Sequence, residues 1–310
     1  MEALSLGIDI GASKIALGLV TDQGEVILRS EIGTKGKTED KLLTDLEQAI
    51  HGLEHGSEKT IRIVGIGSVG PIDIEAGTIS PVNIEIWKNF PIVDFIRRLL
   101  GNEEVTLIGD ATALAYSEYR FGAALGSKNI LGMVVSTGIG GGLIIDGKIY
   151  NGSTFNAGFI GHTYWSNSEE ICACGRKGCL EAISSGPSMT RWFLEKDHSF
   201  QRGIGFQEVA QAAREGNEFA LTAIRRGTKA LAVTIANAAI LLDLDCVVIG
   251  GGVTESGSIF WEPLQSAFES EIEFTQFSKV KKLHKSSLNR NAGVLGAASY
   301  AFDHFAMQST

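Results

Sequence analysis

The feature that most constrains this sequence is an order of predicted elements that occurs twice along the chain. Each time, three short apolar segments follow one another through tight turns, as in an antiparallel meander. These segments lie at residues 4–10, 14–20 and 25–29, and again at residues 129–135, 142–145 and 148–150. The restart near residues 125–127 predicts two α/β lobes of similar topology with a ligand cleft between them.

Helices and further apolar strands follow each meander. Apolar residues recur at helical spacing in residues 39–53. We predict further helices at residues 92–100, 111–121, 206–214, 219–242 and 292–305, and strands at 61–66, 105–108, 246–249 and 280–284. The small residues of the last helix, from Gly293 to Ala298, predict close packing. We expect a smaller lobe of residues 1–122, closed by the helix within 292–310, and a larger lobe of residues 123–291.

Composition narrows the classes of function. The chain of 310 residues has a formal net charge of −9, so it has no electrostatic reason to bind nucleic acid or an anionic membrane. The first predicted strand begins within the first residues, which lack the basic and apolar segments of a signal peptide. The longest apolar run, residues 230–242, is too short to span a bilayer. We therefore expect a cytoplasmic protein.

Three apolar strands end in turns of small residues. These are Asp9-Ile-Gly-Ala-Ser-Lys14, the turn at residues 136–142 with sequence Ser-Thr-Gly-Ile-Gly-Gly-Gly, and Gly250-Gly-Gly252. Glycine lets backbone N–H groups approach an anion, and phosphate is the usual one. One such turn would be an ordinary hairpin or strand-to-helix connection, whereas three favour phosphate binding. The chain has no Walker A pattern, and the segment at 138–143 leads into a strand instead of a helix, which excludes a dinucleotide fingerprint.

Four potential metal ligands gather within eighteen residues of sequence: His162, Cys172, Cys174 and Cys179. One imidazole and three thiolates form a typical tetrahedral zinc site. Because the protein would fill all four positions, none remains for a catalytic water, and we predict a structural zinc ion. The alternative is a set of buried free cysteines with a core histidine; the fourth cysteine, Cys246, we take as a core strand residue.

Two carboxylates are candidates for the chemistry. Asp110 follows a predicted strand end and precedes a helix, at the edge of the sheet where ligands bind in α/β folds. It could accept a hydroxyl proton during phosphoryl transfer or cap the helix. Glu181 lies two residues after the last cysteine, and could hold sugar hydroxyls or start a solvated helix.

Several motifs together resemble those of one family. They are Asp9-Ile-Gly-Ala-Ser-Lys14, Gly65-Ile-Gly-Ser-Val-Gly-Pro71, Trp87 with Asn89, Gly109-Asp110-Ala111, the turn at 136–142, Gly161-His162, Cys172-Ala-Cys-Gly-Arg-Lys-Gly-Cys-Leu-Glu181, Ser185-Gly186-Pro187 and Gly250-Gly-Gly252. The chain resembles the repressor, ORF, kinase (ROK) family of the actin-like sugar kinase superfamily over nearly its whole length. The resemblance implies two ribonuclease H-like lobes and an ATP- and Mg²⁺-dependent kinase of a sugar or sugar-like compound.

The resemblance also implies roles for individual residues. Asp110 would be the catalytic base, and Asp9 and Lys14 would lie near the metal-bound phosphates. The ATP and Mg²⁺ site would comprise Asp9, Gly11, Ser13, Lys14, Thr137, Gly138, Gly140, Gly251 and Gly252. The substrate site would comprise Gly70, Asn83, Gly109, Asn156, Phe159, His162 and Glu181. Family members are usually dimers or tetramers, which implies a homo-oligomer, here taken as a dimer.

The sequence departs from the family pattern at two sugar contacts. Gly109 stands where the family usually has Asn, and Phe159 stands where it usually has Glu. Losing a hydrogen-bonding partner in a buried polar site typically costs about 1–3 kcal/mol. We therefore predict a substrate other than plain glucose, such as an amino sugar, a deoxy sugar or a cyclitol, with Asn156 as partial compensation.

Two other functions fit parts of the sequence. A ROK-type regulator would carry an N-terminal DNA-binding domain, for which the first phosphate motif at Asp9 leaves no room. A sugar-binding protein without catalysis is disfavoured because Asp9, Asp110 and the glycine-rich turns are all present.

Overall fold

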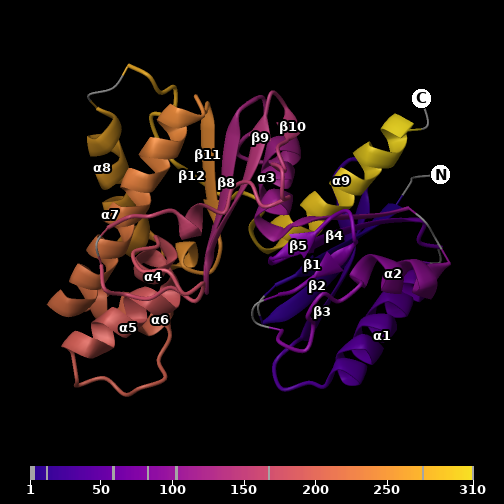
Figure 1. Ribbon diagram of the computed structural model, residues 1–310, viewed down its shortest axis with the longest axis horizontal. Coiled ribbons are helices and arrows are strands. Elements are labelled where there is room, and N and C mark those ends of the chain that lie inside the picture. Colours follow the sequence, from indigo (N-terminus) through magenta and orange to yellow (C-terminus); the bar gives the residue numbers. More distant parts are fainter. Residues whose placement is uncertain are drawn as a thin grey trace.

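The computed structural model describes residues 4–11, 13–57, 60–81, 84–101, 104–166, 168–273 and 276–308. Two five-stranded sheets with the same order of strands form the centres of two lobes (Figure 1). The first lobe contains the sheet β3-β2-β1-β4-β7, and the second contains the sheet β10-β9-β8-β11-β12. In each, a meander is extended by two parallel strands, so the predicted duplication is confirmed.

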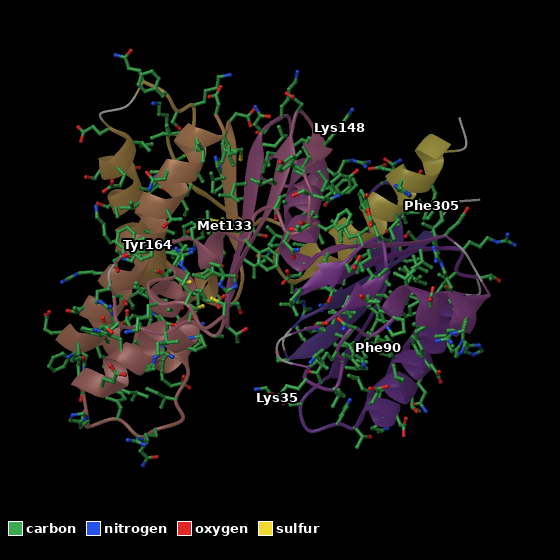
Figure 2. All side chains as sticks on the ribbon, viewed as in Figure 1. Lys35, Phe90, Met133, Lys148, Tyr164 and Phe305 are labelled. Carbon is green, nitrogen blue, oxygen red and sulfur yellow. The ribbon has the colours of Figure 1, made fainter. Side chains whose placement is uncertain are left out.

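The first lobe is built on an almost fully buried central strand. Its strands are β1 (Leu4–Ile10), β2 (Lys14–Thr21), β3 (Val26–Gly33), β4 (Ile63–Ser68) and β7 (Val105–Gly109), with a separate pair of β5 (Ile72–Asp73) and β6 (Thr78–Ile79). β1 pairs antiparallel with β2 and parallel with β4. Helices α1 (Glu39–Ser57) and α2 (Ile92–Leu100) bury their apolar stripes against this sheet, and the labelled Phe90 lies in this lobe (Figure 2).

The second lobe carries more helices. Its strands are β8 (Ile130–Val135), β9 (Ile139–Ile145), β10 (Lys148–Ile149), β11 (Cys246–Gly250) and β12 (His284–Lys285). Its helices are α4 (Glu181–Ser184), α5 (Gly186–Lys196), α6 (Phe206–Arg214), α7 (Glu218–Leu241) and α8 (Ser258–Ile272), with short 3₁₀ turns at Ile160–His162, Thr254–Ser256 and Asn289–Asn291. Leu131 and Met133 of β8 pack in the core with α7 and α8, whereas their neighbour Ile130 packs with α3 on the opposite face.

Two helices connect the lobes. α3 (Asp110–Phe121) follows β7 of the first sheet but packs on β8 and β9 of the second. α9 (Ala292–Gln308) follows β12 of the second sheet but packs on β1 and β4 of the first. The two helices also contact each other between the sheets (Figure 1). The chain crosses from one lobe to the other at these two helices. The boundary between the lobes at residue 122 stays a prediction.

The predicted close packing of the last helix is confirmed. A Cβ atom on Gly296 would lie 1.8 Å from the backbone oxygen of Ala113 in α3. A Cβ on Gly65 in β4 would lie 1.8 Å from the backbone oxygen of Ala297. Backbones this close leave no room for any side chain.

A buried carboxylate joins the two connecting segments. Glu118 of α3 is fully buried, and its oxygens accept four hydrogen bonds. The donors are the N–H of Ala123, the hydroxyls of Ser286 and Ser287, and the N–H of Leu288, at 2.6–3.0 Å. Satisfied acceptors of this kind compensate the cost of burying the charge. Glu118 therefore ties α3 to the segment that leads into α9.

Most predicted elements are found within a few residues of their expected ends. The strand predicted at residues 280–284 is wrong, since the chain forms only the two-residue strand β12, which pairs with β11 through His284 and Lys285. No helix in the described part of the chain combines the length and apolarity that a membrane crossing requires.

Candidate functional site

Asp110 lies where strand β7 ends and helix α3 begins. Gly109 is the N-cap of α3, with φ −69° and ψ 149°, so Asp110 is the first helical residue and not the cap. One carboxylate oxygen of Asp110 accepts a 2.7 Å hydrogen bond from the N–H of Ala111. Burial raises the pKa of the Asp110 carboxyl. A carboxylate with a raised pKa is a stronger base than an exposed aspartate.

Asp9 lies near the end of β1, where its charge and that of Asp110 interact. The pKa of Asp9 is raised to about 7, mainly by burial and also by the charge of Asp110, against the lowering effect of the Lys14 and Arg29 cations. Two carboxyl groups that disfavour each other's ionisation favour a shared proton or a divalent cation. Oxygen ligands of this type suit Mg²⁺.

Two glycines make room for this pair of carboxylates. A Cβ atom on Gly293, in the first turn of α9, would lie 2.4 Å from Oδ2 of Asp9. A Cβ on Gly140, in β9, would lie 3.3 Å from the Cβ of Ala111 and 4.0 Å from Oδ1 of Asp110. The start of α9 therefore lies directly against Asp9. The sequence showed Gly293 only as part of a small-residue run, without its relation to the site.

Two of the predicted glycine-rich turns lie side by side in the second lobe. One occupies residues 136–138 after β8, and the other includes Gly251 and Gly252 after β11. Gly251 has φ +101°, and a Cβ there would lie 2.5 Å from the backbone oxygen of Val135. A Cβ on Gly252 would lie 3.4 Å from the hydroxyl oxygen of Ser136. The parallel pairing of β8 with β11 brings these turns, with Thr137 and Gly138, to one edge of the sheet.

The prediction of a single turn through residues 136–142 is wrong in its second half, because β9 begins at Ile139. Gly141 and Gly142 lie within the strand, where close backbones exclude side chains. A Cβ on Gly141 would lie 2.6 Å from the oxygen of Gly158, and one on Gly142 would lie 2.4 Å from the Cα of Thr112.

The first glycine-rich turn lies between β1 and β2. The N–H of Gly11 donates a 3.0 Å hydrogen bond to the backbone oxygen of Lys14, and Ser13 is exposed. The ammonium group of Lys14 lies 2.8 Å from Oε1 of Glu31, while its charge also acts on Asp9. Lys14 is therefore held at the turn by β3.

The four predicted metal ligands lie together. Their donor atoms all lie within 4.8 Å of one another, with Sγ of Cys172 at 3.5 Å from Nδ1 of His162 and Sγ of Cys174 at 3.7 Å from Sγ of Cys179. Tetrahedral zinc with ordinary bond lengths requires ligand separations of about 3.5–3.8 Å. The donor set and its spacing fit one zinc ion. Burial raises the pKa of Cys172 to about 12 and raises that of Cys179, so zinc binding must displace protons.

Glu181 connects the cysteine cluster to the glycine-rich turn after β8. Its Oε2 accepts a 2.8 Å hydrogen bond from the N–H of Ile139, and a Cβ on Gly138 would lie 2.8 Å from the same oxygen. Sγ of Cys172 lies 3.7 Å from its other oxygen. Glu181 is the first residue of α4, as expected for a helix start, but its carboxylate accepts a hydrogen bond within the site instead of facing solvent.

Phe159 reaches from the second lobe to the first. A Cβ on Gly70, just after β4, would lie 2.7 Å from Cζ of the Phe159 ring. The ring also stacks on His162, with centroids 6.0 Å apart and an interplanar angle of 30°. Phe159 nevertheless remains 40% exposed.

The remaining two predicted substrate residues are less informative. The amide of Asn156 donates to the backbone oxygen of Thr154 in its own loop, and its own Oδ1 is buried with no hydrogen-bond partner among the described residues. Asn83 lies outside the described residues.

Comparison with known proteins decides the family. The family model of the ROK family matches residues 5–304 of the chain. The chain belongs to the ROK family. The family predicted from the motifs is therefore confirmed.

Individual proteins match this chain over most of their length. Glucokinase from Thermotoga maritima is 31% identical over 310 residues, which cover 95% of this chain and 96% of that protein. N-acetylmannosamine kinase from Yersinia pestis is 33% identical over 251 residues, which cover 80% of this chain and 82% of that protein. A crystal structure of a ROK family glucokinase from Streptomyces griseus in complex with glucose and AMPPNP is 28% identical, with a TM-score of 0.83, and covers 97% of this chain and all of that one. This likeness confirms the predicted two-lobed α/β fold.

Proposed function

We propose that this ROK protein is an ATP-dependent kinase that transfers the γ-phosphoryl group to a hydroxyl of a sugar or sugar-like substrate. The observation that carries the proposal is the placement of Asp110. A buried carboxylate with a raised pKa stands at a strand end, beside Asp9 and Gly140. The relatives that act on glucose and on N-acetylmannosamine support the same reaction class.

Asp110 would be the general base. The sugar hydroxyl would lose its proton to a carboxylate oxygen of Asp110 as the hydroxyl oxygen bonds to phosphorus and ADP leaves. Mg²⁺, when bound with ATP, would neutralise charge on the transferred phosphoryl group. Asp9 offers the carboxylate that would hold this cation. Backbone N–H groups of the turns at residues 136–138 and 251–252 would contact the phosphates and adenosine.

The four ligands His162, Cys172, Cys174 and Cys179 would hold zinc in a structural role. All four donors come from the protein, so the ion offers no open position for a reacting group. The hydrogen bond from Ile139 to Glu181 would transmit the order of this cluster to the neighbouring turn. Zinc would therefore shape the substrate site from outside the chemistry.

We also propose a cytoplasmic location and a homodimer. Reduced cysteines are required for the metal cluster, and the cytoplasm keeps thiols reduced. Light scattering of the purified protein would give its oligomeric state.

The experiment that tests the function compares the wild-type protein with Asp110→Asn. Phosphoryl transfer from ATP is measured on hexoses, N-acetylated hexosamines, deoxy sugars and cyclitols. We expect the asparagine variant to lose about 10²–10⁴-fold in kcat on the best substrate, because proton acceptance in the transition state contributes on this scale. The KM for the sugar should change little.

Asp94→Asn is the matched control, because Asp94 is an exposed carboxylate in the first turn of α2 that pairs with Arg97. It should retain wild-type kcat. A wild-type protein that phosphorylates no member of the panel would overturn the kinase proposal. A wild-type kcat in Asp110→Asn would overturn the assigned base.

A further inference from the structure

Glu118 is a fully buried carboxylate that the proposed chemistry does not use. Each of its oxygens accepts one backbone N–H and one hydroxyl: Oε1 from Leu288 and Ser286, and Oε2 from Ala123 and Ser287. A hydroxyl can turn to donate or to accept, but a backbone N–H can only donate. The two N–H groups therefore require an acceptor on both sides of residue 118, which a carboxylate supplies and an amide does not.

We call Glu118 and its four donors the Glu118 junction. The backbone around it is shaped to the carboxylate, because a Cβ on Gly122 would lie 2.0 Å from Oε2 of Glu118. The N–H of Ser286 also donates to the backbone oxygen of Ile249 at 2.9 Å. The junction thus joins three elements, which are the end of α3, the segment that leads into α9, and strand β11.

The two helices that meet at the junction carry parts of the candidate site. α3 begins with Asp110, about two helical turns before Glu118. The segment after Leu288 leads through a 3₁₀ turn into α9, whose Gly293 lies directly against Asp9. Both carboxylates of the site therefore depend on segments that the junction holds.

Strand β11 connects a glycine-rich turn to the same junction. It ends at Gly250 and continues into the turn with Gly251. A Cβ on Gly250 would lie 2.8 Å from Cδ1 of Leu114 in α3 and 3.1 Å from the Cβ of Ser286. The end of β11 is therefore packed against both segments that carry the carboxylates.

We propose that Glu118 is a positioning residue for phosphoryl transfer. It keeps Asp110, the start of α9 over Asp9, and the turn after β11 in one fixed relation. The inference rests on the proposed function and adds the residue that aligns the base with a turn that would hold the nucleotide. Alignment is important because a displacement of about 1 Å can cost about 10²-fold in rate.

The test compares the wild-type protein with Glu118→Gln, which keeps the size of the side chain but supplies one acceptor oxygen in place of two. kcat and the KM values for ATP and for the best sugar are measured at a temperature where melting curves show both proteins to be folded. We expect kcat to fall about 10-fold to 10²-fold, because Asp110 loses its alignment. Both KM values should change little, because the buried side chain of residue 118 acts only through its neighbours.

Two further variants separate positioning from stability. Phe268→Leu is the matched control, because Phe268 is fully buried on α8 in the core of the second lobe. It should lower the melting temperature and keep the wild-type kcat. The double variant of Ser286→Ala and Ser287→Ala keeps both N–H donors and serves if Glu118→Gln fails to fold. It should lower kcat, whereas Phe268→Leu should not.

Amide hydrogen exchange of the ligand-free proteins gives a readout that does not depend on turnover. Peptides that cover the starts of α3 and α9 and the turn after β11 should exchange faster in Glu118→Gln than in the wild-type protein and in Phe268→Leu. Faster exchange confined to Ala123 and Leu288, where the hydrogen bonds are lost, would show a local structural role and overturn the inference.

The kinetic outcomes distinguish this inference from the proposed function. A folded Glu118→Gln with wild-type kcat would overturn the positioning role alone, and so would an equal loss of kcat in Phe268→Leu. Absence of phosphoryl transfer by the wild-type protein to every sugar would overturn the proposed function, and the positioning role with it.

Discussion

At the scale of single residues, the carboxyls of Asp9 and Asp110 are the most unusual groups of the site. Burial raises the pKa of both, and each lies at the end of a parallel strand of the first sheet. Such a pair is costly when both groups are charged and no cation is present. The folded protein therefore holds a local electrostatic cost that a bound divalent cation would remove.

This cost predicts a pH-dependent stability. The pKa of Asp9 in the folded chain is about 7, above its ordinary value of 3.8, so between these values the folded state binds more protons than the unfolded state. Protonated Asp9 contributes favourably to the free energy of unfolding. This contribution is fully present below pH 3.8 and is lost as the pH rises to about 7. Without divalent cations, the free energy of unfolding should fall over this range by at most about 1.4 kcal/mol per pH unit from this group.

Asp9→Asn removes the titrating group and should remove this slope. Urea unfolding between pH 5 and pH 7.5 in metal-free buffer measures it. Asp22→Asn, at an exposed turn, should keep the wild-type slope. Identical slopes in wild type and Asp9→Asn would contradict the raised pKa.

Sequence reasoning identified Asp110 because it directly follows an apolar strand, and Asp9 because it begins the first glycine-rich turn motif. It could not identify Gly293, whose importance depends on α9 returning to the first sheet across more than 280 residues. It likewise identified Phe159 as a substitution in a motif but not its contact with Gly70. Contacts between distant segments leave no local periodicity to detect.

At the scale of elements, the segment from His162 to Glu181 has little regular structure and depends on its ligands. Between the 3₁₀ turn at Ile160–His162 and α4, the described residues form isolated bridges, such as Tyr164 with Cys179, in place of a continuous strand pair. Apart from the small cluster of Cys172, Cys179 and Ala182, few apolar residues hold this segment in place. A bound metal would therefore supply much of its order.

Cys174→Ser should lower the zinc content from about one ion per chain toward none and should reduce the melting temperature and phosphoryl transfer together. A zinc site of this type contributes on the order of several kcal/mol to local folding. Atomic emission measures the zinc, and calorimetry measures the melting. Lys177→Ala, in the same loop, retains all four donors and should retain the metal. Full zinc content in Cys174→Ser would refute the ligand assignment.

The errors in the predicted strands and helices have physical reasons. The glycines of β9 were taken as a turn because three successive glycines favour turns, whereas here they admit the backbones of Gly158 and Thr112. Helix α8 was not predicted, and Pro263 lies inside it. Helix α5 begins with Gly-Pro, which a sequence alone presents as a turn.

At the scale of the whole molecule, the exchange of α3 and α9 between the sheets couples the lobes. Each helix packs on the sheet that did not lead into it, and the two pack on each other (Figure 1). The duplicated strand order was predictable because each meander repeats the same local pattern. The packing of each helix on the other sheet was not predictable. It depends on tertiary contacts between distant segments, such as the hydrogen bonds of Glu118.

The contact between α3 and α9 gives the last prediction. Gly296→Ala places a Cβ 1.8 Å from the backbone oxygen of Ala113, so the two helices must separate. Overpacking of this kind costs about 1–3 kcal/mol of unfolding free energy. Gly33→Ala is the matched control, because a Cβ there meets no atom within 4 Å, and it should change stability by less than about 0.5 kcal/mol. Because α9 also places Gly293 against Asp9, Gly296→Ala should lower kcat at temperatures where it remains folded, and Gly33→Ala should not. Equal unfolding free energies and equal kcat in the two variants would show that the helix contact neither holds the lobes nor positions the site.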